Sequence, residues 1–500
     1  MTNQRKAGVV LGYVNIIVKN LVNLVYTPML LAFVGQADYG VFQTSNSFVF
    51  SLSLLSFGFS GAYIRFYTQK KAHGTEQDIR SLNGLYLVMY LVVSVVALLL
   101  GLLFAANVEL FFSGSFTSDQ VELAGVLMAI MAVSVAATLF STVFDAFIMA
   151  HEQFRFQQSR QLFTTLATPF AALGLLCLGM GAVGVAVAQL AVNVVLLLLN
   201  ARFAIGKLGM RFEVRHFDTK LFKAIAVFSF WIFINQVFEL ANQNLPNIFL
   251  AALTSAVTVS VFAVSMQIRN VFYSLSTTIS SVFIPLINRI VAETNDNNTL
   301  TQLMTRVGRY QAILYLWVLG GFILLGYFFV TKWAGEGFAD AYWLIIAMST
   351  PLFIPLVQNT GIEIQRAKNR HKARSLAYLC MNVLNVILTI LLAPYLGYWA
   401  PAIGYIAYIL LGCGVFMNWY YVRGIGLDMG YFWRHLLPVM VVAIVATGIC
   451  FLGTFALPVT NWLLFFAWGI VFSLIYALLI WLFVLTSDEK NSVKKKLHRS

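Results

Sequence analysis

Fourteen long apolar segments alternate with short polar connections along the chain. Each segment has enough apolar residues to cross a hydrocarbon core about 30 Å thick, and lipid forces such a segment to satisfy its own backbone hydrogen bonds. The pattern therefore predicts an all-α polytopic membrane protein with fourteen transmembrane helices. The predicted spans are 8–33, 39–67, 81–107, 120–150, 161–180, 183–205, 222–250, 255–290, 304–331, 341–366, 372–394, 398–422, 431–453 and 459–485.

Polar positions inside these spans repeat at a fixed offset of 220 residues. Six helices per repeat is an even number, so we expect two parallel repeats in one orientation, followed by an unmatched helix pair. The predicted domains are an N-terminal lobe at 1–221, a C-terminal lobe at 222–425, a helix pair at 426–486 and a basic tail at 487–500. The matched positions are Asn15, Lys19, Asn23 and Thr27 with Asn235, Glu239, Gln243 and Asn247.

Composition and charge agree with this topology. The chain is 60% hydrophobic and only 10% charged, which excludes an ordinary soluble domain. Of its 32 Lys and Arg residues, 29 fall on alternate connections and at both termini, so the positive-inside bias predicts that both termini face the cytoplasm. The net charge of +13 then comes from basic residues on the cytoplasmic loops, where they set the orientation and contact anionic lipid headgroups. We therefore expect no nucleic-acid partner.

The polar stripes indicate where a ligand binds. Residues four apart stack on one helix face, and such a face is costly against lipid. We therefore expect the stripes of the first and seventh helices to face each other or a water-filled cavity. The predicted substrate-binding residues are Lys19, Asn15 and Asn23 on the first helix, Asn46 and Arg65 on the second, Asn235 and Gln243 on the seventh, and Arg269, Asn270 and Tyr273 on the eighth.

Few ionisable side chains lie within the spans. Arg269 is the strongest candidate for an anionic group, because a guanidinium binds phosphate oxygens in pairs and keeps its proton. Lys19 and Glu239 either form a structural ion pair or contact the ligand, and Arg65 either binds ligand or extends to the interface. Glu239, Asp145 and Glu363 are candidates for ion coupling or gating, and we expect the last two to pair with neighbouring basic residues.

Signs of catalysis are missing from the sequence. It has no phosphate-binding P-loop and no paired-histidine metal motif, and its histidines fall at the predicted cytoplasmic boundary. The four cysteines lie inside predicted helices without metal-site spacing. We expect no enzyme activity, no cofactor and no metal.

Short stretches resemble a known transporter superfamily. They are Tyr39 to Phe42 at the start of the second helix, Phe57-Gly58 followed by Arg65 at its end, and Ser281 to Pro285 on the eighth. Together with the six-six-two arrangement, they resemble the multidrug/oligosaccharidyl-lipid/polysaccharide exporters, and within that superfamily the Wzx-type polysaccharide flippases.

The resemblance implies a function. A bacterial cytoplasmic-membrane flippase would move undecaprenyl-pyrophosphate-linked oligosaccharide, of capsule, exopolysaccharide, O-unit or teichoic-acid type, from the inner to the outer leaflet by alternating access. Its partners would be the lipid-linked oligosaccharide, membrane lipids, a coupling sodium ion or proton, and a polysaccharide polymerase. Two alternatives remain open: a cation-coupled multidrug exporter of the same superfamily, and a membrane polysaccharide polymerase.

Overall fold

The computed structural model describes residues 3–56, 58–214, 219–281, 283–368, 370, 372–487 and 489–491. Within helices, the side chains of 3–10, 13, 17, 220, 228, 231, 232, 234–243, 275–281, 284 and 285 lie outside the description. The described residues form helices and connections and contain no β-strand, which confirms the predicted all-α class. By its internal contacts the chain divides into two compact units, Met1–Ser260 (unit 1) and Val261–Ser500 (unit 2).

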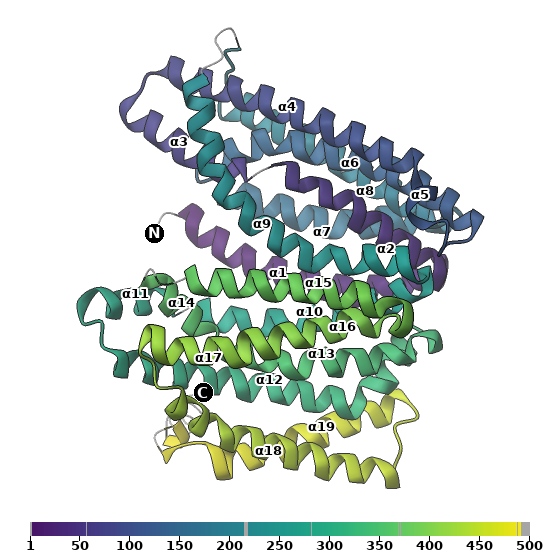
Figure 1. The fold of residues 1–500 in the computed structure, drawn as a ribbon, viewed down its shortest axis with the longest axis vertical. Helices are drawn as coiled ribbons and strands as arrows, with labels where there is room; N and C mark the ends of the chain where they lie inside the picture. The colour runs from purple at the N-terminus through teal and green to yellow at the C-terminus, as the bar shows by residue number, and fades with distance from the viewer. Residues whose placement is uncertain are drawn as a thin grey trace. The chain divides into compact units, whose positions relative to one another are not determined.

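Unit 1 is a bundle of long antiparallel helices (Figure 1). Helix α6 is central, because α4, α8, α2 and α3 all pack against it, while α1 packs on α7 and α9 packs on α2. Its elements are α1 Asn3–Val34, α2 Gln36–Phe50, η1 Ser51–Ser56, α3 Phe59–His73, α4 Glu76–Ala106, α5 Val108–Phe112, α6 Ser118–Ala150, α7 Phe154–Cys177, α8 Gly181–Ala201, η2 Arg202–Lys207 and α9 Thr219–Leu253.

The second predicted span is broken rather than straight. It runs through α2 and the 3₁₀ turn η1 before α3 begins at Phe59. Gly58 precedes α3 with φ of 66°, a left-handed conformation that glycine adopts without a steric penalty. Gly58 therefore supplies the backbone conformation at which α3 begins.

An aromatic core closes one end of unit 1. Tyr63, Tyr67 and Phe147 are buried there, and the Tyr67 hydroxyl lies 2.9 Å from Nε2 of His151. Nδ1 of His151 lies 2.9 Å from the carbonyl oxygen of Phe147. Burial lowers the pKa of His151, the Phe147 contact opposes this shift, and the charge of Lys71 adds to it. The imidazole therefore bridges α3 and α6.

Unit 2 is built around the longest helix of the chain, α12, which packs against α13, α18 and α19 (Figure 1). Several of its helices continue through wider π-helical turns, among them η4, η5 and η6. Its elements are α10 Ala256–Ser281, whose first turn belongs to unit 1, α11 Ile284–Glu293, α12 Asn297–Trp333, η3 Glu336–Phe338, α13 Ala339–Val357, α14 Asn359–Ala367, α15 Lys372–Leu396, α16 Trp399–Ala407, η4 Tyr408–Phe416, α17 Met417–Tyr420, η5 Tyr421–Ile425, α18 Met429–Ala456, α19 Trp462–Leu479 and η6 Ile480–Val484.

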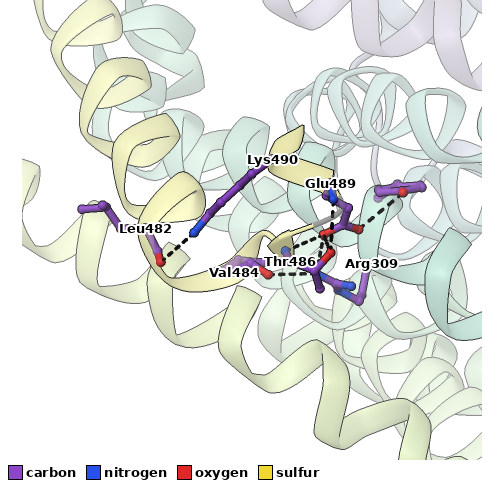
Figure 2. A network of polar contacts seen from close by, with 7 residues as sticks. Arg309, Leu482, Val484, Thr486, Glu489 and Lys490 are labelled. Atoms are coloured by element: carbon purple, nitrogen blue, oxygen red, sulfur yellow. Dashed lines mark hydrogen bonds and ion pairs between the residues drawn. The ribbon is translucent and has the colours of Figure 1, made fainter. Parts of the chain in front are cut away.

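The segment after the last span is tied back to α12 (Figure 2). The Arg309 guanidinium donates from Nη2 to the carbonyl oxygen of Val484 at 2.9 Å and lies 3.3 Å from Oε2 of Glu489. The backbone N–H of Thr486 donates to the same carboxylate oxygen at 2.9 Å. Tyr310, also on α12, donates to the other carboxylate oxygen at 3.4 Å. One carboxylate thus joins the chain beyond η6 to α12.

Where the structure describes them, the residues of each of the fourteen predicted spans are largely helical. In the part of the chain that is described, eleven helical stretches are long and apolar enough to cross a membrane. The other three predicted spans correspond to α7, to α9, and to α10 with α11. Helix α7 has low mean hydropathy because its first half is polar and includes Arg155 and Arg160, whereas many side chains of α9 and α10 lie outside the description. The chain is a multi-pass membrane protein, and the lobe boundaries at 221/222 and 425/426 remain predictions.

Candidate functional site

Arg269 is the predicted site residue with the clearest surroundings. It lies on α10 within unit 2, and only 9% of its surface is exposed. Its Nη2 donates to Oδ1 of the neighbouring Asn270 at 2.6 Å. Its guanidinium carbon lies 4.6 Å from the centre of the Tyr405 ring, which α16 supplies. An amide and an aromatic face therefore hold the guanidinium in one orientation.

No described carboxylate neutralises this arginine. Among the described residues Arg269 forms no ion pair, and its Nε has no hydrogen-bond acceptor. A buried charge without a counter-charge is unfavourable unless a partner compensates it. The arrangement is suited to an anionic ligand, because phosphate and carboxylate oxygens accept paired N–H donors.

A second half-buried arginine and a row of tyrosines extend from this point within unit 2. Tyr405 stacks on Tyr408 with ring centres 6.2 Å apart, and Tyr408 meets Tyr378 edge-on at 5.5 Å. The guanidinium of Arg374 lies 4.7 Å from the Tyr378 ring, and its Nε is also without an acceptor among the described atoms. We call Tyr405, Tyr408 and Tyr378 the tyrosine row.

The sequence analysis did not single out these four residues. Arg374 was counted only as a cytoplasmic-loop charge, and the tyrosines are few among 21 in the chain. A signal was present, because Arg374 and Tyr378 are four apart while Tyr405 and Tyr408 are three apart. Both spacings place the members of a pair on one helix face.

The predicted stripe on α1 does not form one open surface. Asn15 is buried, and its Nδ2 donates to both the backbone and the side-chain oxygen of Gln158 on α7, each at 2.8 Å. Thr27 is also buried, while Lys19 is exposed. The physical reason is that a step of four residues overshoots a turn of 3.6 by about 40°, so three steps rotate the side chains by about 120°. That these residues face one ligand-binding cavity stays a prediction.

The other predicted ligand contacts are distributed over both units. In unit 1, Asn23 on α1 is half-buried and Asn46 on α2 lines a cavity. Arg65 on α3 is exposed, and its guanidinium lies 6.0 Å from the ring centre of Phe66. In unit 2, Asn270 is exposed and Tyr273 is half-exposed. The predictions for Asn235, Gln243 and Glu239, including the pair between Glu239 and Lys19, fall on side chains outside the described residues. Asn247, the last member of the α9 stripe, donates to Ser47 Oγ of α2 at 2.9 Å.

The acidic candidates Asp145 and Glu363 have basic partners, as expected. Asp145 on α6 lies 2.6 Å from Arg160 on α7, and Arg160 also donates to Asn200 on α8 at 2.6 Å. This network joins three helices of unit 1. Glu363 lies 2.8 Å from Arg366, three residues later on α14. The gating or coupling role of either acid stays a prediction.

The described residues contain no group of three or more His, Cys, Asp or Glu side chains able to hold a metal. What they offer is a fixed guanidinium in unit 2 and hydrogen-bonding amides in unit 1. Such groups bind and orient a ligand.

The fold and this site define a class: a multi-pass membrane transporter whose helices present polar and cationic side chains inside the spans. A family profile described as "Polysaccharide biosynthesis protein" matches residues 6–291, more than half of the chain. The chain belongs to this family, which confirms the resemblance to polysaccharide transporters stated from the sequence.

Relatives of known sequence or structure agree. The "Uncharacterized membrane protein EpsK" of Bacillus subtilis (strain 168) is 23% identical over 487 residues, covering 95% of this chain and 94% of that protein. The lipid II flippase MurJ in an inward closed conformation matches with a TM-score of 0.76 and 15% identity, covering 94% of this chain and 98% of that one. An inward-facing MATE transporter of the MOP superfamily matches with a TM-score of 0.61 and 14% identity, over 81% and 94% of the two chains. At these identities the structural matches show a shared fold.

Proposed function

We propose that the protein is a flippase that moves an undecaprenyl-pyrophosphate-linked oligosaccharide from the inner to the outer leaflet of a bacterial cytoplasmic membrane. The family assignment supports a role in polysaccharide biosynthesis. The observation that carries the proposal is the buried Arg269, oriented by Asn270 and Tyr405 and lacking a described carboxylate partner. A pyrophosphate is the part of such a cargo that a guanidinium recognises.

The remainder of the cargo suits other surfaces. A polyprenyl chain is apolar and stays in contact with lipid, and an apolar groove of about 560 Å³ is available in unit 2 between α13, α17 and α18. Trp419 and Trp433 line this groove, and Arg423 lies beside them. In our proposal both termini face the cytoplasm, and the cargo crosses by alternating access driven by a sodium or proton gradient or by the membrane potential. A polysaccharide polymerase would receive the flipped cargo.

The test is transport in proteoliposomes that contain the full chain. A fluorescent undecaprenyl-pyrophosphoryl disaccharide is placed in one leaflet, and its appearance in the other is followed by quenching. Hydrogen bonds to charged groups contribute about 1.5–3 kcal/mol each, so Arg269→Ala should weaken cargo binding by about 10- to 100-fold. Arg269→Lys keeps the charge but loses the paired donors, and should be intermediate.

The matched control is Arg289→Ala, which removes an exposed arginine from α11. It should transport like the unaltered protein. If Arg269→Ala inserts normally and flips the cargo at the original rate, Arg269 does not bind the pyrophosphate and the proposal loses its main support.

A further inference from the structure

A cavity with apolar walls and several polar side chains lies in unit 1 among α2, η1, α6, α7 and α8, far along the chain from Arg269. Its volume is about 360 Å³, within the range of about 300–1,000 Å³ typical of small-molecule sites. Apolar walls come from Val49, Phe50 and Met131. Its polar lining consists of Asn46, Ser53, Ser134, Thr138, Thr168, Gln189 and Asn193.

Much of this polar lining has no protein partner. Among the described residues, the side chains of Asn46, Thr168 and Gln189 make no hydrogen bond to the protein. Asn193 uses its Nδ2 to donate to Ser134 Oγ at 2.8 Å, so its amide oxygen remains available. The side chains of Asn46, Thr168 and Gln189 are half-buried, so their amide and hydroxyl groups are open to a ligand that enters the cavity. Several such groups around one cavity suit a hydrogen-bonding occupant.

The chemistry of the lining selects an uncharged occupant. Every residue that lines the cavity is neutral, so neither a phosphate nor an ammonium group would find a counter-charge there. Amides and hydroxyls both donate and accept, which matches the hydroxyl and N-acetyl groups of a sugar. Phe50 adds an aromatic surface for the C–H face of a sugar ring.

The helix of unit 2 that corresponds to α2 by sequence offset carries a charged residue. Helix α2 begins at Gln36 and α10 begins at Ala256, 220 positions later. At this offset Val49 and Phe50 correspond to Arg269 and Asn270, and Ser53 corresponds to Tyr273. Two of the positions that line the neutral cavity, Val49 and Phe50, therefore correspond by this offset to the buried arginine and to the asparagine that accepts its hydrogen bond.

We propose that this cavity of unit 1 binds an uncharged sugar residue of the lipid-linked cargo, while the pyrophosphate binds at Arg269. This proposal rests on the proposed flippase function for the identity of the cargo. It divides recognition between a neutral site for the glycan and a cationic site for the headgroup. Cargo with uncharged sugars is transported in preference to the same lipid without sugar.

The test compares two probes in the same proteoliposomes: fluorescent undecaprenyl pyrophosphate, and the same lipid carrying an uncharged disaccharide. Thr168→Trp fills the cavity from α7, and Gln189→Leu removes an amide without adding bulk. The control is Thr165→Trp, one turn earlier on α7, where the residue does not line the cavity. We expect both cavity variants to lower disaccharide-lipid flux at least tenfold and to leave flux of the sugar-free lipid within twofold. The control should change neither.

Two results would overturn the sugar site: equal loss for both probes in folded Gln189→Leu protein, or no loss for either probe in both cavity variants. Failure of the flippase function is a separate outcome, in which the unaltered protein moves neither lipid. Binding of the radiolabelled free disaccharide to purified protein then decides the matter. Saturable binding that Thr168→Trp removes and Thr165→Trp retains supports a site for soluble sugar, and no saturable binding refutes the proposal.

Discussion

The carboxylate of Glu489 should control how firmly the segment after the last span is held to α12. Substitution by glutamine keeps the shape of the side chain but removes its charge. The contacts at stake are those to Arg309 at 3.3 Å, to Tyr310 at 3.4 Å and to the Thr486 N–H at 2.9 Å (Figure 2). The perturbation therefore tests one charge at the centre of a small network.

The magnitude follows from burial. Hydrogen bonds to charged groups contribute about 1.5–3 kcal/mol, whereas exposed ion pairs contribute about 0–1 kcal/mol. The side chains of Arg309 and Glu489 are 14% and 19% exposed, between these limits. We expect Glu489→Gln to lower the free energy of local opening by about 1–2 kcal/mol, which is about a 5- to 30-fold increase in opening.

Hydrogen exchange of the protein in nanodiscs measures this opening directly. Amides of residues 486–491 should exchange about 5- to 30-fold faster in Glu489→Gln, after correction for intrinsic rates. The control is Lys490→Gln, because Lys490 makes only a 3.5 Å contact with the Leu482 carbonyl oxygen. It should exchange like the unaltered protein.

The same contact predicts a pH dependence. Burial raises the pKa of Glu489. Hydrogen bonds from Thr486 and the charge of Arg309 lower this pKa by more than burial raises it, so the net shift is downward from 4.5. A depressed folded pKa means that the stabilisation is complete above the unfolded value and is lost as pH falls through the folded value. The unaltered segment should loosen below about pH 4.5, and Glu489→Gln should not. Equal protection of both proteins at neutral pH would refute the reasoning.

Two further predictions concern unit 1. Asp145→Asn should lower the free energy of unfolding by about 1–3 kcal/mol, because it leaves the Arg160 charge partly buried without its carboxylate. Adding Arg160→Gln should recover part of this loss, measured by thermal unfolding. An unchanged melting temperature in Asp145→Asn would contradict this prediction. Burial lowers the pKa of His151, so its contribution to stability is present above the unfolded pKa of about 6.5 and is lost as pH falls through the folded value. His151→Phe should flatten the dependence of unfolding on pH between about 5 and 7, and an identical slope would show that another group titrates.

The positions of helices were predictable because they depend on local physics. Hydrophobic length and the charge of connections require no knowledge of partners, and the offset of 220 between repeated polar positions reappears in the starts of α2 and α10.

Side-chain partners were less predictable because they depend on which neighbouring helix comes close. Asn15 has the spacing of a cavity stripe, yet its amide is used by Gln158 of α7. Arg374 had the appearance of a loop charge, yet it packs on Tyr378. Arg269 was identified from its charge alone, whereas Tyr405, which fixes its orientation, comes from a helix more than a hundred residues later.

The correspondence between α2 and α10 bears on how a shared fold can serve different cargo. The two helices begin 220 positions apart, and the predicted repeat places Val49 and Arg269 at corresponding positions with different side chains. A neutral pocket and a buried guanidinium cannot bind the same chemical group with equal strength, because only the second compensates a negative charge. In our proposal, an amphipathic cargo with an uncharged glycan and an anionic headgroup uses both sites. A small cation would find a counter-charge at neither site, so this pair of positions favours a lipid-linked sugar over a cationic drug.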